Sequence, residues 1–365
     1  MKKIDVILNE NSYPIFIGGG ILSNLSKLIE KYNLNKNILL IIDEKVIELY
    51  KKRIFSQFYA HNGKINYYVV KQGEKSKSFI ELNKIYSCLL QNNYGRDSLI
   101  IAIGGGVTGD LAGYAAATYM RGIPLVQVPT TLLSMVDSSI GGKTGINFED
   151  KKNMIGAFYQ PEFVLIDTDF LQTLPRREIT SGLGEVIKYT YLADEKFFLY
   201  VLNHLKLAYE NNRYVLEQFI YNSAAIKAAV VSQDEKESGL RKILNLGHTF
   251  AHSFETNLKF KISHGEAVIA GIISALFLSQ KTGLISEKEL EYYLALPLKV
   301  KLPLQLIKPS TENLFKVMLH DKKNRAGKIK FVLVSGPGKI ILDVEADKKA
   351  VNYAVNKMKQ SIHRF

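Results

Sequence analysis

Four polar side chains recur along one short stretch of the chain, where Arg241, Asn245, His248 and His252 stand at offsets of 0, 4, 7 and 11. An α-helix turns once in about 3.6 residues, so this spacing predicts one helix with all four side chains on the same face. Such a face does not suit an apolar core, because each buried polar group needs a partner. The chain must therefore fold around a polar cavity, and the two imidazoles point to a metal-bearing one.

The pair His248 and His252 has the helical His-x-x-x-His spacing that can chelate zinc. In zinc proteases the residue directly after the first histidine is the glutamate that acts as general base. That position is Thr249 here, which argues against a protease. A single histidine on a helix is more often an ordinary core residue. The company of Arg241 and Asn245 is what favours a site.

The composition is that of a globular protein with room for two domains: 365 residues, 47% apolar and 23% charged. The single cysteine, Cys88, excludes an intramolecular disulfide and fits a reducing compartment. The N-terminal segment has no apolar core like that of a signal peptide. The longest apolar run, 267–278, is too short to span a bilayer. These features predict a cytoplasmic protein.

The net charge of +13 suits three kinds of anionic partner: nucleic acid, a membrane surface or small anions. The lysines are dispersed, with no run of five, and no aromatic residues are interleaved with basic ones. We therefore expect small anionic substrates as partners, and neither nucleic acid nor membrane.

The first half of the chain alternates apolar segments with amphipathic ones, which predicts an α/β domain with a largely parallel sheet. A helix is expected at 79–91, and strands are expected at 37–42, 67–70, 98–103, 125–128 and 163–167. From about residue 175 a helical period dominates, with a short strand near 329–334 and helices near 176–192, 194–210, 214–235, 241–257, 264–282 and 286–294. The predicted fold is a Rossmann-like domain over 1–174 and a mainly α-helical domain over 175–365, with the active site in the cleft between them.

A glycine-rich segment, Gly104-Gly-Gly-Val-Thr-Gly109, satisfies the G-x-G-x-x-G pattern between a predicted strand and a predicted helix. Glycines there let the backbone approach a pyrophosphate, which the N-terminus of the helix stabilises. The motif follows the third or fourth predicted strand rather than the first, so it is not the usual dinucleotide fingerprint. A tight turn explains it equally well.

A second glycine-rich segment, Asp137 to Gly145, contains Gly141-Gly-Lys-Thr144, which resembles the end of a Walker A motif. The first glycine of that motif would stand at position 137, where this chain has an aspartate, and this disfavours an ATPase. With Lys143 the segment suits an anion or a diphosphate. The plainer interpretation is a flexible surface loop.

Two further segments bring metal-ligand chemistry. Glu185 and Lys188 stand three apart on a predicted helix, and His264-Gly-Glu266 opens another helix. Together Glu185, His248 and His264 offer one carboxylate and two imidazoles, a three-ligand set common in catalytic zinc sites. Taken separately, Glu185 with Lys188 is an ordinary ion pair, and His264 is a helix cap.

Over nearly its whole length the chain resembles the 3-dehydroquinate synthase family. The resemblance rests on several segments that are specific only together: Gly104 to Gly113, Tyr119 to Pro124, Gln127 to Thr131, Asp137 to Gly145, Ser181 to Lys188, Asp234 to Arg241, the histidine segment, His264 to Val268, and Asp321 to Lys323. Two positions depart from the common pattern. Gly184 stands where alanine is usual, and Ser263 precedes His264 where an aromatic residue or leucine is frequent. Neither departure removes a functional group.

The resemblance implies an enzyme that uses NAD and one divalent metal, zinc or cobalt, and forms a homodimer. Its substrate would be 3-deoxy-D-arabino-heptulosonate 7-phosphate, converted to 3-dehydroquinate and phosphate in the shikimate pathway of aromatic amino acid biosynthesis. In this chemistry NAD⁺ oxidises C5 transiently, phosphate is eliminated, the ketone is reduced again, and an intramolecular aldol closure forms the ring.

The resemblance also implies roles for individual residues. Glu185, His248 and His264 would bind the metal, and His252 would contact a hydroxyl or phosphate and transfer protons. Arg121 would reach the substrate phosphate across a dimer interface, and a lysine at 322 or 323, Lys322 or Lys323, would add a contact. The remaining substrate contacts would be Lys143, Lys152, Asn153, Lys188, Lys227, Arg241 and Asn245. The NAD contacts would be Asp43, Glu74, Lys77, Gly105, Gly106, Asp110, Thr130, Thr131, Asp137, Lys143, Lys152 and Thr173.

Three other functions remain open. Another sugar-phosphate cyclase, acting on sedoheptulose 7-phosphate or glucose 6-phosphate, would share the fold, NAD and metal. Arg241, Lys227 and Asn245 favour the heptulosonate, because they suit its carboxylate. A metal-dependent polyol dehydrogenase would release NADH, and a non-enzymatic basic protein would bind nucleic acid in a salt-sensitive way without metal.

Overall fold

The computed structural model describes residues 1–34, 37–149, 151–319 and 329–363. The chain forms two compact units, Met1–Leu174 with Leu216–Lys236, and Pro175–Val215 with Glu237–Phe365. Residues 216–236 are predicted to belong to the second domain, whereas the structure groups this segment with the first unit. The reason is a set of specific polar contacts. The Lys227 ammonium lies 2.9 Å from a carboxylate oxygen of Asp137, and the Ile7 amide donates to the Ser232 hydroxyl.

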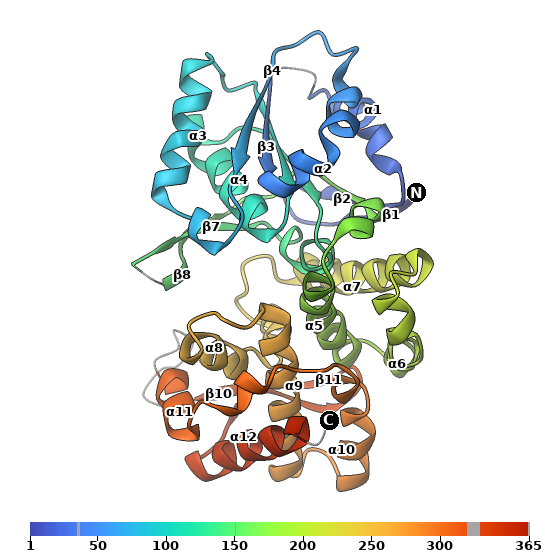
Figure 1. The fold of residues 1–365 in the computed structure, drawn as a ribbon, viewed down its shortest axis with the longest axis vertical. Coiled ribbons are helices and arrows are strands. Elements are labelled where there is room, and N and C mark those ends of the chain that lie inside the picture. The colour runs from blue at the N-terminus through green and yellow to red at the C-terminus, as the bar shows by residue number, and fades with distance from the viewer. Residues whose placement is uncertain (35–36, 150, 320–328, 364–365) are drawn as a thin grey trace. The chain divides into compact units, whose positions relative to one another are not determined.

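A seven-stranded sheet forms the centre of the first unit, in the order β1-β2-β9-β6-β5-β3-β4 (Figure 1). Its strands are β1 (Lys2–Val6), β2 (Tyr13–Gly18), β3 (Ile38–Asp43), β4 (Ile65–Val70), β5 (Leu99–Gly104), β6 (Leu125–Pro129) and β9 (Phe163–Asp167). The pairing of β1 with β2 is antiparallel, and all other pairings in this sheet are parallel. The five predicted strands and the parallel sheet are therefore confirmed, while β1 and β2 were not predicted.

The central strands of the sheet are buried on both faces, because helices cover a parallel sheet on both sides. Every residue of β5 and all but the last residue of β3 are buried. Leu39 and Ile41 share one core cluster with apolar side chains of α3 and α4. The helices of this unit are α1 (Leu25–Lys31), α2 (Glu44–Phe55), α3 (Phe79–Gln91), α4 (Gly106–Thr118) and the greater part of α7 (Arg213–Gln233).

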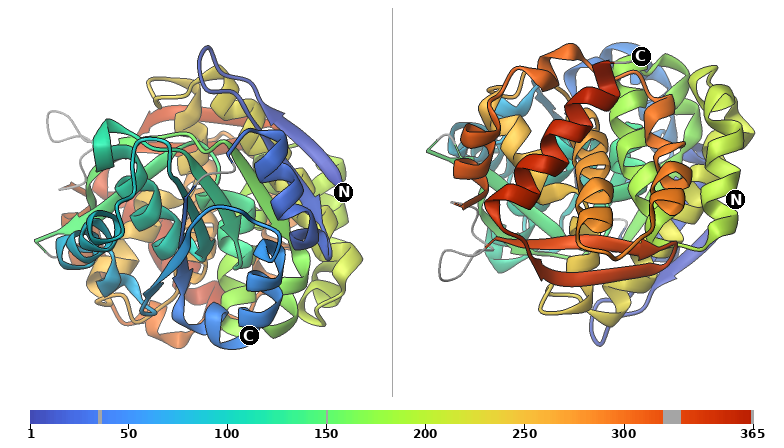
Figure 2. Two further views of the ribbon diagram at one scale, coloured as in Figure 1. Left: turned by 90° about the horizontal axis from the view of Figure 1, so that it is seen from above. Right: turned by 90° about the horizontal axis from the view of Figure 1, so that it is seen from below.

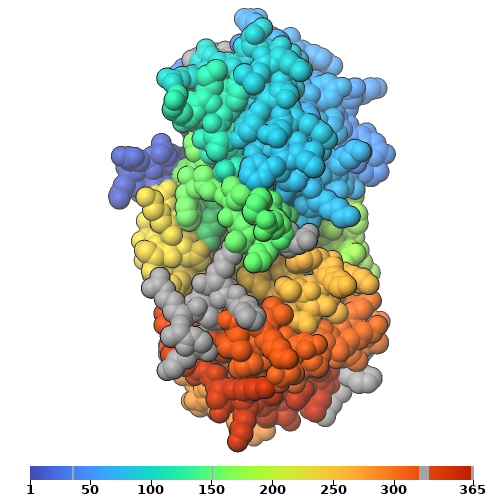
Figure 3. All heavy atoms as spheres, turned by 90° about the vertical axis from the view of Figure 1, so that its left-hand side faces the viewer, coloured from blue at the N-terminus to red at the C-terminus, as the bar shows by residue number. Residues whose placement is uncertain are grey.

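A β-hairpin of β7 (Lys143–Phe148) and β8 (Lys151–Phe158) packs beside α4 and α3, and Figure 3 shows it in green on one face of the molecule. From the sequence, its first strand is predicted to be part of a glycine-rich loop. The loop is short in fact: Gly141 and Gly142 make the turn with positive φ angles, and the strand begins at Lys143. A Cβ atom on Gly113 of α4 would lie 2.4 Å from the Thr144 side chain, so this glycine allows the hairpin to approach the helix.

The second unit is mainly helical and is built around α9 (His264–Lys281), which is buried along most of its length. In the view from below in Figure 2, α12 and the hairpin of β10 and β11 lie against α9. The other elements are α5 (Arg176–Leu192), α6 (Glu195–Tyr209), α8 (His248–Asn257), α10 (Glu287–Leu294), α11 (Thr311–Leu319), β10 (Lys330–Gly336), β11 (Lys339–Glu345) and α12 (Lys348–His363). The predicted mainly helical character is confirmed, although β11, α11 and α12 were not predicted.

The single helix predicted over 241–257 is wrong. Residues Leu240–Asn245 form a 3₁₀ turn, η7, and α8 begins only at His248. Gly247 separates the two with a left-handed φ of 77°, a conformation that glycine adopts at little cost. Arg241 and Asn245 therefore do not share a helix face with the two histidines, and the polar stripe of the sequence divides at this glycine.

Asp167, at the end of β9, is the polar anchor of the first unit. Its fully buried carboxylate accepts hydrogen bonds from the amides of Gly20, Leu22 and Asp169 and pairs with Arg53 at 2.6 Å. We expect Asp167→Ala to lower the free energy of unfolding by about 3 kcal/mol, because buried donors lose their acceptor. Chemical denaturation measures this. Asp5→Ala, which removes an exposed carboxylate of the same unit, is the control and should change little.

Candidate active site and metal centre

In the first unit, eight of the twelve predicted NAD residues end or follow five parallel strands. Asp43 ends β3, and Glu74 and Lys77 follow β4. Gly105 and Gly106 follow β5, Thr130 and Thr131 follow β6, and Thr173 follows β9. Because parallel strands end at the same edge, these residues gather there, where open α/β sheets bind their ligands.

Two features of this edge fit a dinucleotide. Gly105 precedes α4, and no side chain caps this end, so the amides at the N-terminus of the helix suit an anion. A Cβ atom on Gly105 would lie 3.1 Å from the Thr131 side chain, so the glycine keeps the approach open. Asp43 caps α2 by accepting from the amides of Lys45 and Val46, and burial raises the pKa of its carboxyl above the ordinary value.

Lys77 is the buried cation of this edge. Its ammonium donates to Asp110 at 2.6 Å and to the Asn153 side chain at 2.5 Å. Burial raises the pKa of the Asp110 carboxyl, against the opposing effect of the Lys77 charge. Lys77 follows β4, Asp110 lies on α4 and Asn153 lies on β8. Three predicted site residues from separate segments therefore meet at the Lys77 ammonium.

The other predicted residues of the first unit lie on α7, on the turn that contains Asp137, on the β7–β8 hairpin and on the turn after α4. Lys227 of α7 donates to the backbone carbonyl of Asp137 at 2.8 Å as well as pairing with its carboxylate. Lys143 is exposed at the start of β7, and Lys152 is half-buried on β8. Arg121 is exposed in the turn after α4, where Met120 and Arg121 both have positive φ angles. Arg121 is not in contact with any of the residues that gather at the strand ends, among the contacts that the structure describes.

In the second unit, Glu185, His248 and His264 come together as predicted from separate helices. One ligand atom from each lies within 4.8 Å of the other two. Oε1 of Glu185 is 3.2 Å from Nε2 of His264 and 3.5 Å from Nε2 of His248. A buried carboxylate with two converging imidazoles is the donor set of a catalytic zinc site with an open position, so the residues fit a divalent metal.

Close backbone contacts assemble this set. A Cβ atom on Gly265 would lie 1.9 Å from the carbonyl oxygen of Ser181, and one on Gly184 would lie 2.5 Å from the Cα of Gly265. A Cβ atom on Gly271 would lie 2.1 Å from the carbonyl oxygen of Gly247. Helix α9 therefore touches α5 and the start of α8 backbone to backbone, which only glycine allows.

Charges around the set are compensated. Lys188, one turn after Glu185 on α5, is buried and forms an ion pair with its carboxylate. Burial lowers the pKa of the His264 imidazole, but hydrogen bonds to Glu185 and Glu255 outweigh this and raise it to about 10. The buried Glu185 carboxylate is therefore balanced by the ammonium of Lys188.

The four polar residues that the sequence predicts on one helix face lie on two elements, η7 and α8. The ring centroids of His248 and His252 are 5.6 Å apart on α8, while Arg241 is buried on η7. The amide of Asn245 donates to the carboxylate of Glu237 at 2.7 Å. Sequence reasoning missed Glu237, although it lies inside the quoted segment Asp234 to Arg241. Lys323 and its neighbour Lys322 lie outside the described residues.

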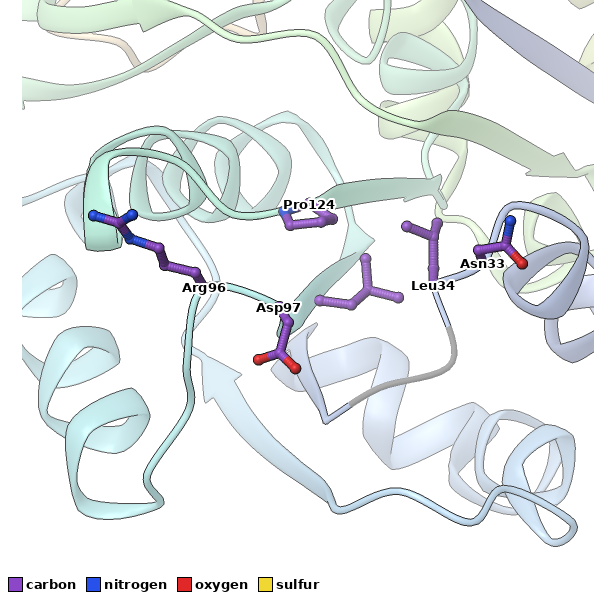
Figure 4. Close-up of a pocket in the computed structure, with 6 residues that line it drawn as sticks. Asn33, Leu34, Arg96, Asp97 and Pro124 are labelled. Atoms are coloured by element: carbon purple, nitrogen blue, oxygen red, sulfur yellow. The ribbon is translucent and has the colours of Figure 1, made fainter.

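A hollow of about 280 Å³ in the first unit is a different place. Figure 4 shows its lining, which is Asn33, Leu34, Arg96, Asp97, Leu99 and Pro124. Leu99 begins β5 and Pro124 directly precedes β6, so the hollow lies at the amino ends of parallel strands. It is therefore at the edge opposite to the predicted NAD residues, none of which lines it.

None of the helices in the described part of the chain combines the length and the apolar character that crossing a bilayer requires.

Comparison with known proteins gives consistent matches. Models of the N-terminal and C-terminal parts of 3-dehydroquinate synthase match residues 67–181 and 182–324. A protein named 3-dehydroquinate synthase from Saccharophagus degradans is 44% identical over 96% of this chain and 97% of its own length.

Two solved structures are similar over nearly the whole chain. A 2-deoxy-scyllo-inosose synthase complexed with carbaglucose-6-phosphate, NAD⁺ and Co²⁺ has a TM-score of 0.88 and 25% identity, covering 98% of this chain and 99% of its own. A 2-epi-5-epi-valiolone synthase from Streptomyces hygroscopicus with NAD⁺ and Zn²⁺ bound has a TM-score of 0.86 and 26% identity, covering 97% and 98%.

The glycine contacts give a first test of the site. We expect Gly265→Ala to lower the free energy of unfolding by about 3 kcal/mol or more, because the new Cβ atom forces α9 away from α5. Zinc affinity should fall with it, because Glu185 and His264 move apart. Denaturation and zinc titration measure the two effects. Lys288→Ala, at an exposed position of α10, is the control, and a Gly265→Ala protein that behaves like it would contradict the proposed packing.

Proposed function

Because the chain belongs to the 3-dehydroquinate synthase family, we propose that it converts 3-deoxy-D-arabino-heptulosonate 7-phosphate to 3-dehydroquinate and phosphate. This is a carbon–oxygen lyase reaction of the shikimate pathway. The single observation that best supports it is the convergence of Glu185, His248 and His264 within 4.8 Å, with the buried ammonium of Lys188 beside them.

Glu185, His248 and His264 would hold one divalent metal ion, zinc or cobalt, as in the two cyclase structures. When bound, such an ion acts as a Lewis acid that favours ionisation of the substrate hydroxyl to be oxidised. Lys188 then has two roles. It balances the Glu185 carboxylate, and its ammonium suits a substrate oxygen that becomes negative.

The carboxyl edge of the sheet would hold NAD, which supplies the transient oxidation and is regenerated in each cycle. Gly105 and Gly106 leave room for the pyrophosphate at the N-terminus of α4. The carboxylate of Asp43 suits the hydroxyls of the adenosine ribose. The remaining proposed contacts are Glu74, Lys77, Asp110, Thr130, Thr131, Asp137, Lys143, Lys152 and Thr173.

The substrate carries a phosphate and a carboxylate, so cations and amides must replace its water shell. We assign these contacts to Lys143, Lys152, Asn153, Lys188, Lys227, Arg241 and Asn245. The guanidinium of Arg241 is suited to bind a carboxylate in a bidentate way. His252, one turn beyond His248, suits proton transfer to a hydroxyl or phosphate oxygen. Arg121 would contact the substrate in the site of a partner subunit, which requires a homodimer. The homodimer and the cytoplasmic location both stay predictions.

Phosphate release tests the function directly. Purified protein with NAD, zinc and the heptulosonate phosphate should release one phosphate per 3-dehydroquinate formed, with no accumulation of NADH. Sedoheptulose 7-phosphate and glucose 6-phosphate should be poor substrates, because they lack the carboxylate. Turnover of either one in place of the heptulosonate would favour another cyclase. Steady NADH formation with glycerol would favour a polyol dehydrogenase.

The two histidines nearest His248 should respond differently to substitution. His264→Ala should lose both bound metal and turnover, because a ligand is removed. His252→Ala should keep the metal but lower kcat by about 10²- to 10⁴-fold, the usual range for a lost proton-transfer group. Metal analysis and phosphate release on both proteins check this. Loss of metal from His252→Ala would contradict the assigned roles.

A further inference from the structure

Helix α8 carries a third polar residue on the face of its two histidines. Glu255 lies seven residues after His248, close to two helical turns, so both side chains project to the same side. The Glu255 side chain is only 6% exposed, and its Oε1 lies 3.5 Å from Nδ1 of His264. The other ring nitrogen of His264, Nε2, faces Glu185 at 3.2 Å. The imidazole is thus held between two carboxylates, one on each side.

The other histidine of the cluster has a similar arrangement. Nδ1 of His248 lies 3.2 Å from the carbonyl oxygen of Leu246, and its Nε2 lies 3.5 Å from Glu185. A carbonyl oxygen only accepts hydrogen bonds, so Nδ1 of His248 carries the hydrogen. Both imidazoles therefore present Nε2 to Glu185 and Nδ1 to an acceptor that belongs to, or directly precedes, α8.

We infer that Glu255 is a positioning residue of the metal centre, which accepts a hydrogen bond from Nδ1 of His264 and leaves Nε2 to bind the ion. The inference rests on the proposed function, because it takes Glu185, His248 and His264 as the ligands. Histidine ligands of metals commonly donate their other N–H group to a carboxylate or a carbonyl. That hydrogen bond fixes the tautomer and the orientation of the ring and makes the ligand more basic.

The surroundings of Glu255 require a partner that donates a hydrogen bond or carries a positive charge. The residue lies in the last turn of α8, where the helix dipole disfavours a negative charge. A buried carboxylate also has a large desolvation penalty unless partners compensate it. The imidazole of His264 is such a partner, and because His264 is the first residue of α9, it stands at the positive end of a second helix.

A second carboxylate at the start of α9 is already engaged. Glu266 accepts from the backbone amide of Ser263 at 2.7 Å and completes a capping box with the Ser263 hydroxyl. It holds the end of the helix rather than the ring of His264. Of the two carboxylates, Glu255 is the one that lies against Nδ1.

Zinc affinity tests the inference without reference to turnover. We would compare the unaltered protein with Glu255→Gln, Glu255→Ala and His264→Ala, using competition with a chromophoric chelator. Loss of an outer hydrogen bond to a ligand typically weakens metal binding by about 10- to 100-fold. We expect Glu255→Ala to fall in that range. Glu255→Gln should lose less, because its amide oxygen still accepts, and His264→Ala should lose more than either. Glu287→Gln, at an exposed position of α10, is the matched control and should bind zinc normally.

Two spectroscopic readouts separate positioning from folding. In the zinc-loaded protein, proton NMR should show a downfield Nδ1–H signal of His264 that disappears or moves in Glu255→Ala. In the cobalt-loaded protein, the visible absorption bands should shift in the same variant. The melting temperature of each metal-free protein reports on folding. If Glu255→Ala does not fold, the isosteric Glu255→Gln carries the test.

The outcomes separate the role of Glu255 from the identity of the metal ligands. If His264→Ala loses zinc while both folded Glu255 variants keep normal affinity and unaltered spectra, the positioning role of Glu255 is overturned and the ligand set stands. If the unaltered protein does not bind zinc or cobalt, or if His264→Ala binds as well as it does, the proposed metal centre fails, and the role of Glu255 fails with it.

Discussion

Backbone contact between helices is the constraint on which the metal centre depends. Each of the three proposed ligands is the chain neighbour of a glycine: Glu185 follows Gly184, His248 follows Gly247, and His264 precedes Gly265. Those glycines are where α5 and the start of α8 meet α9, at separations that leave no room for a Cβ atom. Two helices that touch backbone to backbone bring the side chains next to the contact into reach of one another. The positions of the three ligands therefore depend on the neighbouring glycines.

The first unit uses a different principle for its proposed cofactor. A parallel sheet gathers the carboxyl ends of its strands at one edge, so residues far apart in sequence become neighbours without any helix crossing. Asp43 and Thr173 are 130 positions apart, yet Asp43 ends β3 and Thr173 lies in the segment that follows β9. The ion pair of Lys77 and Asp110 then joins the segment after β4 to helix α4. The common direction of the strands brings the proposed cofactor residues together, whereas the glycine contacts bring the proposed metal ligands together.

Much of this was predictable from the sequence, and the exceptions have physical reasons. Apolar runs identified five strands, and helical periodicity identified most helices of the second unit. The spacing of side chains does not reveal the sign of φ, so it predicted a helix through Gly247, which in fact lies between η7 and α8. The antiparallel hairpin of β7 and β8 was missed because its glycines and polar residues resemble a loop. No sequence signal indicated that residues 216–236 would pack with the first unit.

The candidate site was predictable where chemistry is rare and spacing is regular. Glu185, His248 and His264 were selected by residue type and resemblance, and the structure brings them together. Glu255 had a signal, since it continues the histidine spacing by one more turn, but a glutamate near a helix end looks like ordinary surface. Its burial and its contact with Nδ1 of His264 appear only in three dimensions. The hydrogen bond between Asn245 and Glu237 could not be predicted either, because it depends on the turn that η7 makes.

X-ray absorption at the zinc edge identifies the ligands of the bound ion themselves. For the zinc-loaded protein we expect a first shell of nitrogen and oxygen at about 2.0–2.2 Å, with the outer scattering of two imidazoles and with no sulfur. A shell with one imidazole or none would contradict the assembly of His248 and His264 around one ion by the glycine contacts of α9.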